Sequence, residues 1–285
     1  MLYPWAGLAL VCLQVLAQEA FAGFGAIVAD ASSVSSPYAI VAIHPHNVSS
    51  FTEGLLFDGG HLLESTGLSG QSFIRELDAL TGLCTGNEFK FPDGIFGEGI
   101  TVLNGTIYAL SYQAKIGYAL DRSTFALQRE FAFATTTGEG WGMTNDGAHL
   151  IVSDGSATLL FLDPTSLVEV RRIVVTQHGA DVRLLNELEY IAGEIFANVW
   201  YTNQILRIDP ATGHVRDALL LDQLPLLENH ARTIAAEDWR KMDAVMNGIA
   251  HNPLNDHVYV TGKLWDAVFE LDLALPKVVH GRRVH

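Results

Sequence analysis

The chain has 285 residues, of which 49% are hydrophobic, so it is long and apolar enough to bury a substantial core. Its 32 acidic residues outnumber its 17 basic residues and give a formal net charge of −15 at pH 7. Because a chain of this charge repels phosphate groups, we expect no nucleic-acid partner.

Residues 1–22 predict a cleaved secretory signal peptide. The apolar stretch 5–17 carries no charge and, at about 13 residues, is short for a bilayer span. A small-x-small cleavage pattern follows at residues 20–22. We therefore expect a protein that is secreted or held in the secretory pathway, in the endomembrane lumen, the vacuole or outside the cell. We also expect no stable membrane insertion. The alternative is that the apolar stretch is an uncleaved membrane anchor.

Cleavage would leave the mature chain with one thiol and no internal disulfide, because Cys12 lies in the predicted signal peptide and Cys84 does not. Asn47 and Asn104 begin glycosylation sequons, which predict a glycoprotein if the cell is eukaryotic. An N-terminal segment, 23–40, precedes the repeats described next.

A repeat of forty-odd residues runs through the rest of the chain. Five strand-like segments each end in an Asp that opens a turn, and successive members lie 43, 42, 46 and 63 residues apart: Asp78, Asp121, Asp163, Asp209 and Asp272. Short apolar segments bounded by turns, such as 107–112 and 195–199, predict strands between them. Repeats of this length built from short strands are typical of β-propeller blades.

A second series agrees with the first. The residue expected to face the central channel at the start of each blade's inner strand recurs at spacings of 45, 43, 45 and 61: Glu53, Glu98, Trp141, Asn186 and Asn247. Gly follows four of the five, which suits a crowded axis, but Glu187 takes that place in the fourth blade and breaks the pattern. We predict an all-β, five-bladed β-propeller over residues 41–275, followed by a C-terminal tail, 276–285.

The long last spacing contains a helical insertion near the last blade. Over residues 222–246 the apolar positions fall on one stripe and predict an amphipathic helix: Leu227, Ala231, Ile234, Met242 and Val245. This helix would either cover the mouth of the channel or pack against a blade edge.

Two carboxyl groups at the channel are the first candidates for chemistry. Glu98 lies between two glycines, and burial there would raise its pKa into a range useful for proton transfer. Glu53 is the equivalent residue one blade earlier, so the pair cannot both ionise easily if they approach closely. The alternative is a ring of polar residues that holds the blades together through water. A cation from Lys263 in the closing blade would keep one carboxylate ionised.

Aromatic side chains are expected around the same end of the channel and predict a binding pocket: Phe51, Phe96, Tyr112, Trp141, Trp200 and Trp265. For Trp200 the strand alternation equally allows a place between blades. The histidines are scattered and only His44 and His46 are paired, without further ligands at metal-binding spacing. A nucleophile elbow and a phosphate-binding Gly loop are also missing from the sequence. We expect neither a metal nor another cofactor.

Nine short motifs in order carry a resemblance to a known family: Phe51-Thr-Glu-Gly-Leu, Glu64-Ser-Thr-Gly-Leu-Ser-Gly-Gln-Ser72, Phe96-Gly-Glu-Gly-Ile, Gly140-Trp-Gly, Val152-Ser-Asp-Gly-Ser156, Leu185-Asn-Glu-Leu-Glu-Tyr-Ile191, Ala197-Asn-Val-Trp200, Asn247-Gly-Ile-Ala and Val260-Thr-Gly-Lys-Leu-Trp265. Over residues 42–273 the chain resembles the plant-type, zinc-independent glutaminyl-peptide cyclotransferases, which are five-bladed propellers.

The resemblance implies conversion of N-terminal glutamine in peptides or proteins to pyroglutamate, with release of ammonia, by an acyltransferase that we expect to be a monomer. Glu98, at the position of the family's catalytic Glu, would move the proton. Asn186 and Lys263 would bind the carboxamide and support charge in the tetrahedral intermediate. Trp141, Trp200 and Phe51 would form the aromatic wall.

Two departures from the family pattern lie in the same region. Glu53 stands where the family usually has Gln, and Tyr112 stands where it usually has Trp. We expect the extra carboxyl group to raise the pKa of the pair and to shift the activity optimum upward. Two other functions stay open from the sequence: a glycoside hydrolase that uses the two carboxylates, and a catalytically inactive propeller that only binds.

Overall fold

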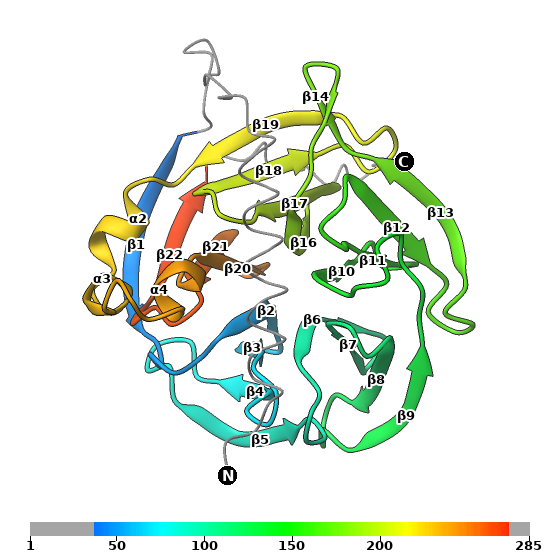
Figure 1. Ribbon diagram of the computed structural model, residues 1–285, viewed down its shortest axis with the longest axis horizontal. Helices are drawn as coiled ribbons and strands as arrows, with labels where there is room; N and C mark the ends of the chain where they lie inside the picture. The colour runs from blue at the N-terminus through cyan, green and yellow to red at the C-terminus, as the bar shows by residue number, and fades with distance from the viewer. Residues whose placement is uncertain (1–36, 274–285) are drawn as a thin grey trace, which may run out of the picture. The chain divides into compact units, whose positions relative to one another are not determined.

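The computed structural model describes residues 37–273, in which five four-stranded antiparallel sheets surround a common axis (Figure 1). The predicted five-bladed propeller is therefore confirmed. Blade 1 contains β2 (Thr52–Asp58), β3 (His61–Thr66), β4 (Phe73–Leu77) and β5 (Cys84–Lys90). Blade 2 contains β6 (Gly97–Leu103), β7 (Thr106–Ser111), β8 (Ile116–Asp121) and β9 (Leu127–Ala132).

The next two blades repeat this order from the inner to the outer strand. Blade 3 contains β10 (Met143–Asn145), β11 (Leu150–Val152), β12 (Thr158–Leu162) and β13 (Glu169–Val174). Blade 4 contains β16 (Leu185–Ile191), β17 (Glu194–Val199), β18 (Gln204–Ile208) and β19 (Val215–Leu220). A two-stranded ribbon of β14 (Thr176–Gln177) and β15 (Ala180–Asp181) lies between them in the sequence.

Blade 5 closes the ring with strands from both ends of the described chain. It contains β20 (Met246–Asn252), β21 (His257–Gly262) and β22 (Ala267–Leu273), and β1 (Tyr38–Pro45) is its outer strand. The pairing is antiparallel, with Tyr38 opposite Leu273 and Pro45 opposite Ala267. The strand begins a few residues before the predicted start at 41. The predicted signal peptide and C-terminal tail lie outside the described residues.

The predicted Asp turns join outer strands as expected. Asp78 accepts hydrogen bonds at Oδ1 from the backbone N–H groups of Leu80 (3.1 Å) and Thr81 (2.8 Å). Asp121, Asp163 and Asp209 make the same pair of bonds two and three residues ahead. Asp272 lies within β22, and the residues that follow it are outside the described range.

The core lies between the blades. Five clusters of buried apolar side chains each combine residues from two neighbouring blades. Ile74 of blade 1 and Ile107 of blade 2 share one cluster, and Leu55 of blade 1 and Val268 of blade 5 share the cluster at the closure. Each blade is therefore held mainly by burial of apolar surface against its two neighbours.

The insertion between β19 and β20 is not the single amphipathic helix predicted from the sequence. It contains three one-turn helices beside blade 5, α2 (Leu224–Leu227), α3 (His230–Thr233) and α4 (Arg240–Asp243) (Figure 1). The chain turns to extended backbone at Glu228 and Ile234. Glu228 is buried and accepts hydrogen bonds from the N–H groups of Ala231 and Asp266. The local bond from Ala231 and the tertiary bond from Asp266 take the place of the bonds that a continuous helix would make at this point.

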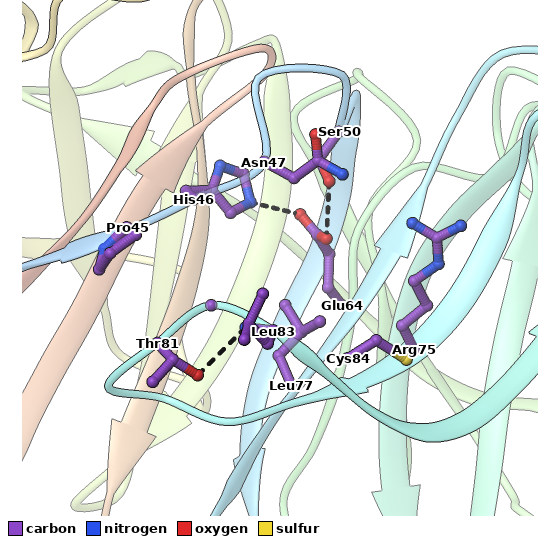
Figure 2. A pocket seen from close by; sticks show the side chains of 11 residues that line it. Pro45, His46, Asn47, Ser50, Glu64, Arg75, Leu77, Thr81, Leu83 and Cys84 are labelled. Atoms are coloured by element: carbon purple, nitrogen blue, oxygen red, sulfur yellow. Dashed lines mark hydrogen bonds and ion pairs between the residues drawn. The ribbon is translucent and has the colours of Figure 1, made fainter.

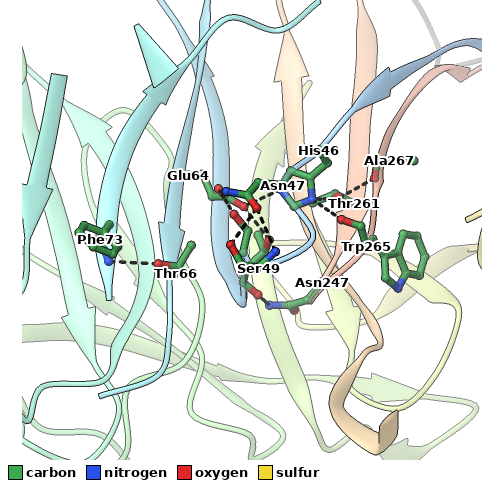
Figure 3. A network of polar contacts seen from close by, with 12 residues as sticks. His46, Asn47, Ser49, Glu64, Thr66, Phe73, Asn247, Thr261, Trp265 and Ala267 are labelled. Carbon is green, nitrogen blue, oxygen red and sulfur yellow. Dashed lines mark hydrogen bonds and ion pairs between the residues drawn. The ribbon is translucent and has the colours of Figure 1, made fainter. Parts of the chain in front are cut away.

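A buried ion pair joins blade 1 to the end of β1, the outer strand of blade 5. The imidazole Nε2 of His46, which follows β1, lies 2.8 Å from Oε1 of Glu64 in β3, and both side chains are 1% exposed. The pair and the β4–β5 turn line a pocket of about 280 Å³. Figure 2 shows the side chains that line it. His46 Nδ1 lies 2.9 Å from the carbonyl oxygen of Trp265 in blade 5. Figure 3 shows this contact within the polar network around His46. Thr52 donates to the same oxygen of Glu64, Oε1, and Ser50 donates to the other, Oε2.

Each member of the pair favours the ionised form of the other in spite of their burial. Burial by itself lowers the pKa of His46, but the carboxylate of Glu64 outweighs it and raises that pKa above the ordinary 6.5. Burial likewise raises the pKa of Glu64, but the charge of His46 and the hydrogen bonds to the carboxylate bring it below the ordinary 4.5. Folding therefore favours the ionised form of both groups.

The Glu64→Gln substitution should lower the free energy of unfolding by about 3 kcal/mol at pH 6, because it removes one partner of a buried pair. The contribution of His46 is fully present below pH 6.5 and is lost as the pH rises through its higher folded-state pKa. That of Glu64 is present above pH 4.5 and is lost as the pH falls through its lower folded-state pKa. Urea unfolding should thus show the largest loss between pH 4.5 and 6.5.

Glu88→Gln is the matched control. Glu88 pairs with Arg75 at 2.7 Å in the same blade, but its side chain is 39% exposed. We expect this substitution to change the free energy of unfolding by less than about 1 kcal/mol. Equal losses in the two variants would show that burial does not set the strength of the His46–Glu64 pair.

Candidate active site

A register shift near the start of four inner strands brings polar side chains to the axis. In β6, Gly97 pairs with Ser111 and Ile100 pairs with Ala109, so the inner strand holds one extra residue between these pairs. The same shift occurs near the start of β2, β16 and β20. Such bulges redirect side chains and are common beside active sites. The four irregular segments contain Glu53, Glu98, Asn186 and Asn247.

The axis is crowded, as the glycines of the repeat predicted. A Cβ atom on Gly99 would lie 2.4 Å from the backbone nitrogen of Met143 in the next blade. A Cβ atom on Gly142 would lie 2.1 Å from the carbonyl oxygen of Asn186. Neighbouring inner strands therefore approach at distances that exclude any side chain at these two positions.

Glu187, the exception to the glycine pattern, links three blades. Its side chain is 1% exposed and accepts hydrogen bonds from the N–H group of Leu55 in blade 1 (3.1 Å) and from that of Ile249 in blade 5 (2.9 Å). Burial, together with the nearby carboxyl group of Glu189, raises the pKa of Glu187 well above its ordinary value. The carboxyl group that breaks the sequence repeat thus satisfies two backbone donors of other blades.

Glu53, Glu98 and Lys263 form a buried charge cluster. Lys263, which follows β21, places its Nζ 2.7 Å from both carboxyl oxygens of Glu53. The side chains of Glu53 and Glu98 are hydrogen-bonded to each other. The exposed fractions of these three residues are 1%, 6% and 5%. Glu53 of blade 1 and Glu98 of blade 2, both predicted site residues, therefore meet Lys263 of blade 5, the predicted cation.

The charge cluster holds a proton near neutral pH. Burial raises the pKa of Glu53 to about 7, although the Lys263 ammonium group opposes the shift. Burial and then the negative charge of Glu53 raise the pKa of Glu98 well above its ordinary value. Because a hydrogen bond between two carboxyl groups needs one proton, the pair is one acid and one carboxylate once the pH exceeds the Glu53 pKa of about 7. It can therefore both accept and donate a proton.

Five buried polar atoms have no hydrogen-bond partner within the described chain, and three of them belong to inner-strand bulges or to a ring beside Lys263: Asn186 Oδ1, Asn247 Oδ1 and Trp200 Nε1. Leaving a buried polar atom unpaired costs about 1–3 kcal/mol, so such atoms are rare without a reason. Asn186 and Trp200 are both predicted site residues, and they offer one acceptor and one donor. A carboxamide group carries the complementary pair, an N–H donor and a carbonyl acceptor.

Aromatic rings surround the charge cluster. Lys263 Nζ lies 4.7 Å from the ring centroid of Phe51 and 5.8 Å from that of Trp200. The rings of Trp141 and Trp200 are perpendicular, with centroids 5.2 Å apart. These contacts bring the predicted aromatic wall together around the ammonium group, where the rings exclude water and strengthen electrostatic interactions.

Of the two remaining predicted aromatics, Tyr112 lies at the site and Trp265 lies in the core. Tyr112 is half-buried and lies 5.8 Å from Phe96, and burial together with Glu139 raises the pKa of its hydroxyl. It therefore remains a phenol at neutral pH. Trp265, predicted among the aromatics at the channel, is 1% exposed and packs in the core cluster between blades 4 and 5.

The insertion adds two residues that the sequence did not indicate. Trp239, the residue before α4, lies 6.1 Å from the ring of Phe51. Asp243 is 8% exposed and accepts a hydrogen bond from the hydroxyl of Tyr201 at 3.2 Å. Burial raises the pKa of Asp243, and Lys263 partly offsets this. Part of the insertion therefore contacts the site, as the predicted cover would, whereas Leu224 and Ala231 pack against blades 4 and 5, as the alternative predicted. Trp239 and Asp243 lie outside the repeat, so no pattern identified them.

Comparison with known proteins identifies the family. The sequence model of a family described as glutamine cyclotransferase matches residues 8–273. The chain belongs to the glutamine cyclotransferase family. A glutaminyl-peptide cyclotransferase of Arabidopsis thaliana is 36% identical over 235 residues, which cover 82% of this chain and 70% of the plant protein. The crystal structure of Myxococcus xanthus glutaminyl cyclase matches with a TM-score of 0.76 and 31% identity, over 85% of this chain and 98% of that one.

Membership of the glutamine cyclotransferase family agrees with the resemblance seen in the nine motifs. Glu53 and Tyr112, the two departures from the family pattern, both lie at the site: Glu53 in the charge cluster and Tyr112 against Phe96. Within residues 37–273, no group of three or more His, Cys, Asp or Glu side chains could hold a metal ion. No helix in that range is long and apolar enough to cross a membrane.

Replacing Lys263 with Met should raise the pKa of Glu53 above its value of about 7, because the substitution removes the cation that favours the carboxylate. Carboxyl ¹³C NMR titration measures this, with the Glu53 signal assigned from its loss in Glu53→Gln. Lys90→Met, which removes a half-exposed lysine of β5, is the control and should leave that titration unchanged. The same midpoint in wild type and Lys263→Met would show that Lys263 does not set the protonation of the pair.

Proposed function

We propose that this protein cyclises the N-terminal glutamine of peptides or proteins to pyroglutamate and releases ammonia. The observation that carries the proposal is the hydrogen-bonded Glu53–Glu98 pair held by Lys263, a proton-transfer group buried among aromatic rings. The family of the chain and the names of its relatives in Arabidopsis and Myxococcus support the same reaction.

The reaction needs one proton to move from the attacking nitrogen to the leaving nitrogen. The neutral α-amine, which has a pKa of about 8, attacks the γ-carboxamide carbon and forms the new C–N bond. The amine loses one proton, the old C–N bond breaks, and the leaving NH₂ group gains one proton to become ammonia. Glu98 accepts the first proton and donates the second, as a carboxyl group with a raised pKa can.

The other site residues hold the substrate and the developing charge. Lys263 stabilises the oxyanion of the tetrahedral intermediate, and the unpaired Nε1–H of Trp200 is a second donor for it. The unpaired Oδ1 of Asn186 accepts a hydrogen bond from the carboxamide nitrogen. Since the reaction is intramolecular, positioning of the amine against its own side chain supplies much of the rate.

The glycoside hydrolase reading loses its support. Retaining glycosidases hold their two carboxyl groups about 5–5.5 Å apart and inverting ones about 6.5–9.5 Å apart, with the sugar or water between them. Glu53 and Glu98 are hydrogen-bonded to each other, so no group fits between them. The inactive binding propeller is an outcome of the following test.

Ammonia release from a glutaminyl dipeptide should fall by a factor of at least about 100 in Glu98→Gln, because the amide cannot carry the proton. Wild type should keep its rate in the presence of a strong chelator. The control is Glu88→Gln, in which an exposed carboxylate of β5 is removed and activity should be unchanged. No release by folded wild type would identify a propeller that binds without catalysis.

Glu53→Gln should move the acidic limb of the log(kcat/KM) profile to lower pH by about one unit. Glu98 must be ionised to accept a proton, and after burial the charge of Glu53 is the largest cause that raises its pKa. Removing that charge lets Glu98 ionise at lower pH. Initial rates measured across the pH range test this. An unchanged limb would mean that Glu53 does not tune Glu98.

We also propose that the protein enters the secretory pathway and carries glycans. Its apolar N-terminal stretch, which lies outside the described residues, supports the first expectation. Asn47 and Asn104 are both exposed, which makes their sequons accessible to modification. The test is to express the protein in eukaryotic cells and to recover it from the medium, which checks secretion. Replacement of both asparagines by Gln should then abolish the gel mobility shift that glycans cause.

A further inference from the structure

We propose that Trp239 is a specificity-determining residue that contacts the side chain of the second residue of the substrate, and that this side chain is preferentially large and apolar. The inference rests on the proposed function, because it assumes that the N-terminal glutamine reacts at Glu98. The residues needed for proton transfer all lie outside the insertion between β19 and β20. The inference gives this insertion a function of its own.

The insertion is fixed to the site rather than loosely placed beside it. The carbonyl oxygen of Val245 accepts a hydrogen bond from the N–H group of Lys263 at 2.9 Å. The carbonyl oxygen of Ala244 accepts one from Trp265 Nε1 at 3.3 Å. With the Tyr201–Asp243 bond, these contacts tie the end of α4 to the loop that carries the catalytic cation. The position of Trp239 relative to Lys263 is thereby set by the fold.

Two buried side chains, Lys263 and Phe51, connect the charge cluster to the exposed ring of Trp239. Lys263 is 5% exposed and its Nζ lies 4.7 Å from the ring of Phe51, which is 4% exposed. The ring of Phe51 lies 6.1 Å from that of Trp239, which is 40% exposed. Phe51 is thus the contact between the buried reacting groups and a large aromatic surface open to solvent.

The substrate must follow such a path. Its reacting atoms, the α-amine and the γ-carboxamide, belong to the first residue, and the rest of the peptide extends from the α-carbon toward solvent. Consecutive α-carbons are 3.8 Å apart. When the first residue binds beside Phe51, the side chain of the second residue therefore lies within reach of the neighbouring ring of Trp239. Met242, one turn after Trp239 and 56% exposed, adds apolar surface beside it.

Charge argues against an acidic second residue. Glu237 lies two residues before Trp239, whereas Asp238 is paired with Arg240. The half-buried Glu139 lies near Glu98 and Tyr112 on the blade 3 side of the site. The chain as a whole carries a net charge of −15. A carboxylate on the second residue would be repelled, whereas an aromatic or aliphatic side chain would gain contact area with Trp239.

The test compares kcat/KM for two amidated dipeptides, Gln-Phe and Gln-Gly, in wild type and Trp239→Ala. We expect wild type to prefer Gln-Phe and Trp239→Ala to lose about tenfold of that preference through KM, with kcat for Gln-Gly unchanged within twofold. Trp239→Gln, which keeps a long side chain without a ring, should lose the preference equally, and Trp239→Phe should retain most of it. Leu254→Ala is the matched control, because Leu254 is 84% exposed in the β20–β21 turn at the opposite end of β20 from Asn247.

The outcomes separate this inference from the proposed function. An unchanged Gln-Phe to Gln-Gly ratio in Trp239→Ala and Trp239→Gln, with active wild type, would overturn the role of Trp239 and leave the reaction standing. Equal loss of kcat on both dipeptides would also overturn it, because Trp239 would then support the reacting end. No ammonia release from either dipeptide by wild type would overturn the reaction itself and this inference with it.

Discussion

Closure of the ring is the constraint on which the rest of the structure depends. A radial array of sheets buries its apolar faces only when the last blade meets the first, and an open ring would leave two faces exposed to water. Here β1 supplies the outer strand of blade 5, and the cluster around Leu55 and Val268 fills the closing interface. The His46–Glu64 ion pair adds an electrostatic link in that interface. The interface as a whole joins residues from the two ends of the described chain.

Closure also fixes the site, because its members come from different blades. Glu53 and Glu98 belong to blades 1 and 2, whereas Lys263 comes from the closing blade. Their mutual contact exists only when blade 5 meets blade 1. Bulges at equivalent points of the inner strands turn side chains toward the axis, and the crowding at Gly99 and Gly142 leaves little freedom to move. Rigid positioning of this kind is what an intramolecular ring closure requires.

Burial of three ionisable groups gives the site its chemistry. In water both carboxyl groups would be ionised at pH 7, and neither would move a proton usefully. Low dielectric raises both pKa values, one proton remains between them, and the Lys263 ammonium prevents the pair from becoming fully neutral. The unpaired atoms of Asn186 and Trp200 reduce stability, and such a cost is tolerated where a substrate provides the missing bonds.

Short-range pattern in the sequence determined the blades, because Asp turns and alternating strands depend on neighbouring residues only. The spacing of Glu53, Glu98 and Asn186 also predicted their common place at the axis, since a repeat returns each inner strand to an equivalent position. The tertiary structure alone decided the rest. Glu187 has no local reason to replace Gly, because its partners Leu55 and Ile249 belong to other blades. The segment 222–246 has helical periodicity, but contacts of Glu228 and Asp243 with blades 4 and 5 divide it into short turns and bring Trp239 to Phe51. Such contacts join residues distant in sequence, and no local pattern encodes them.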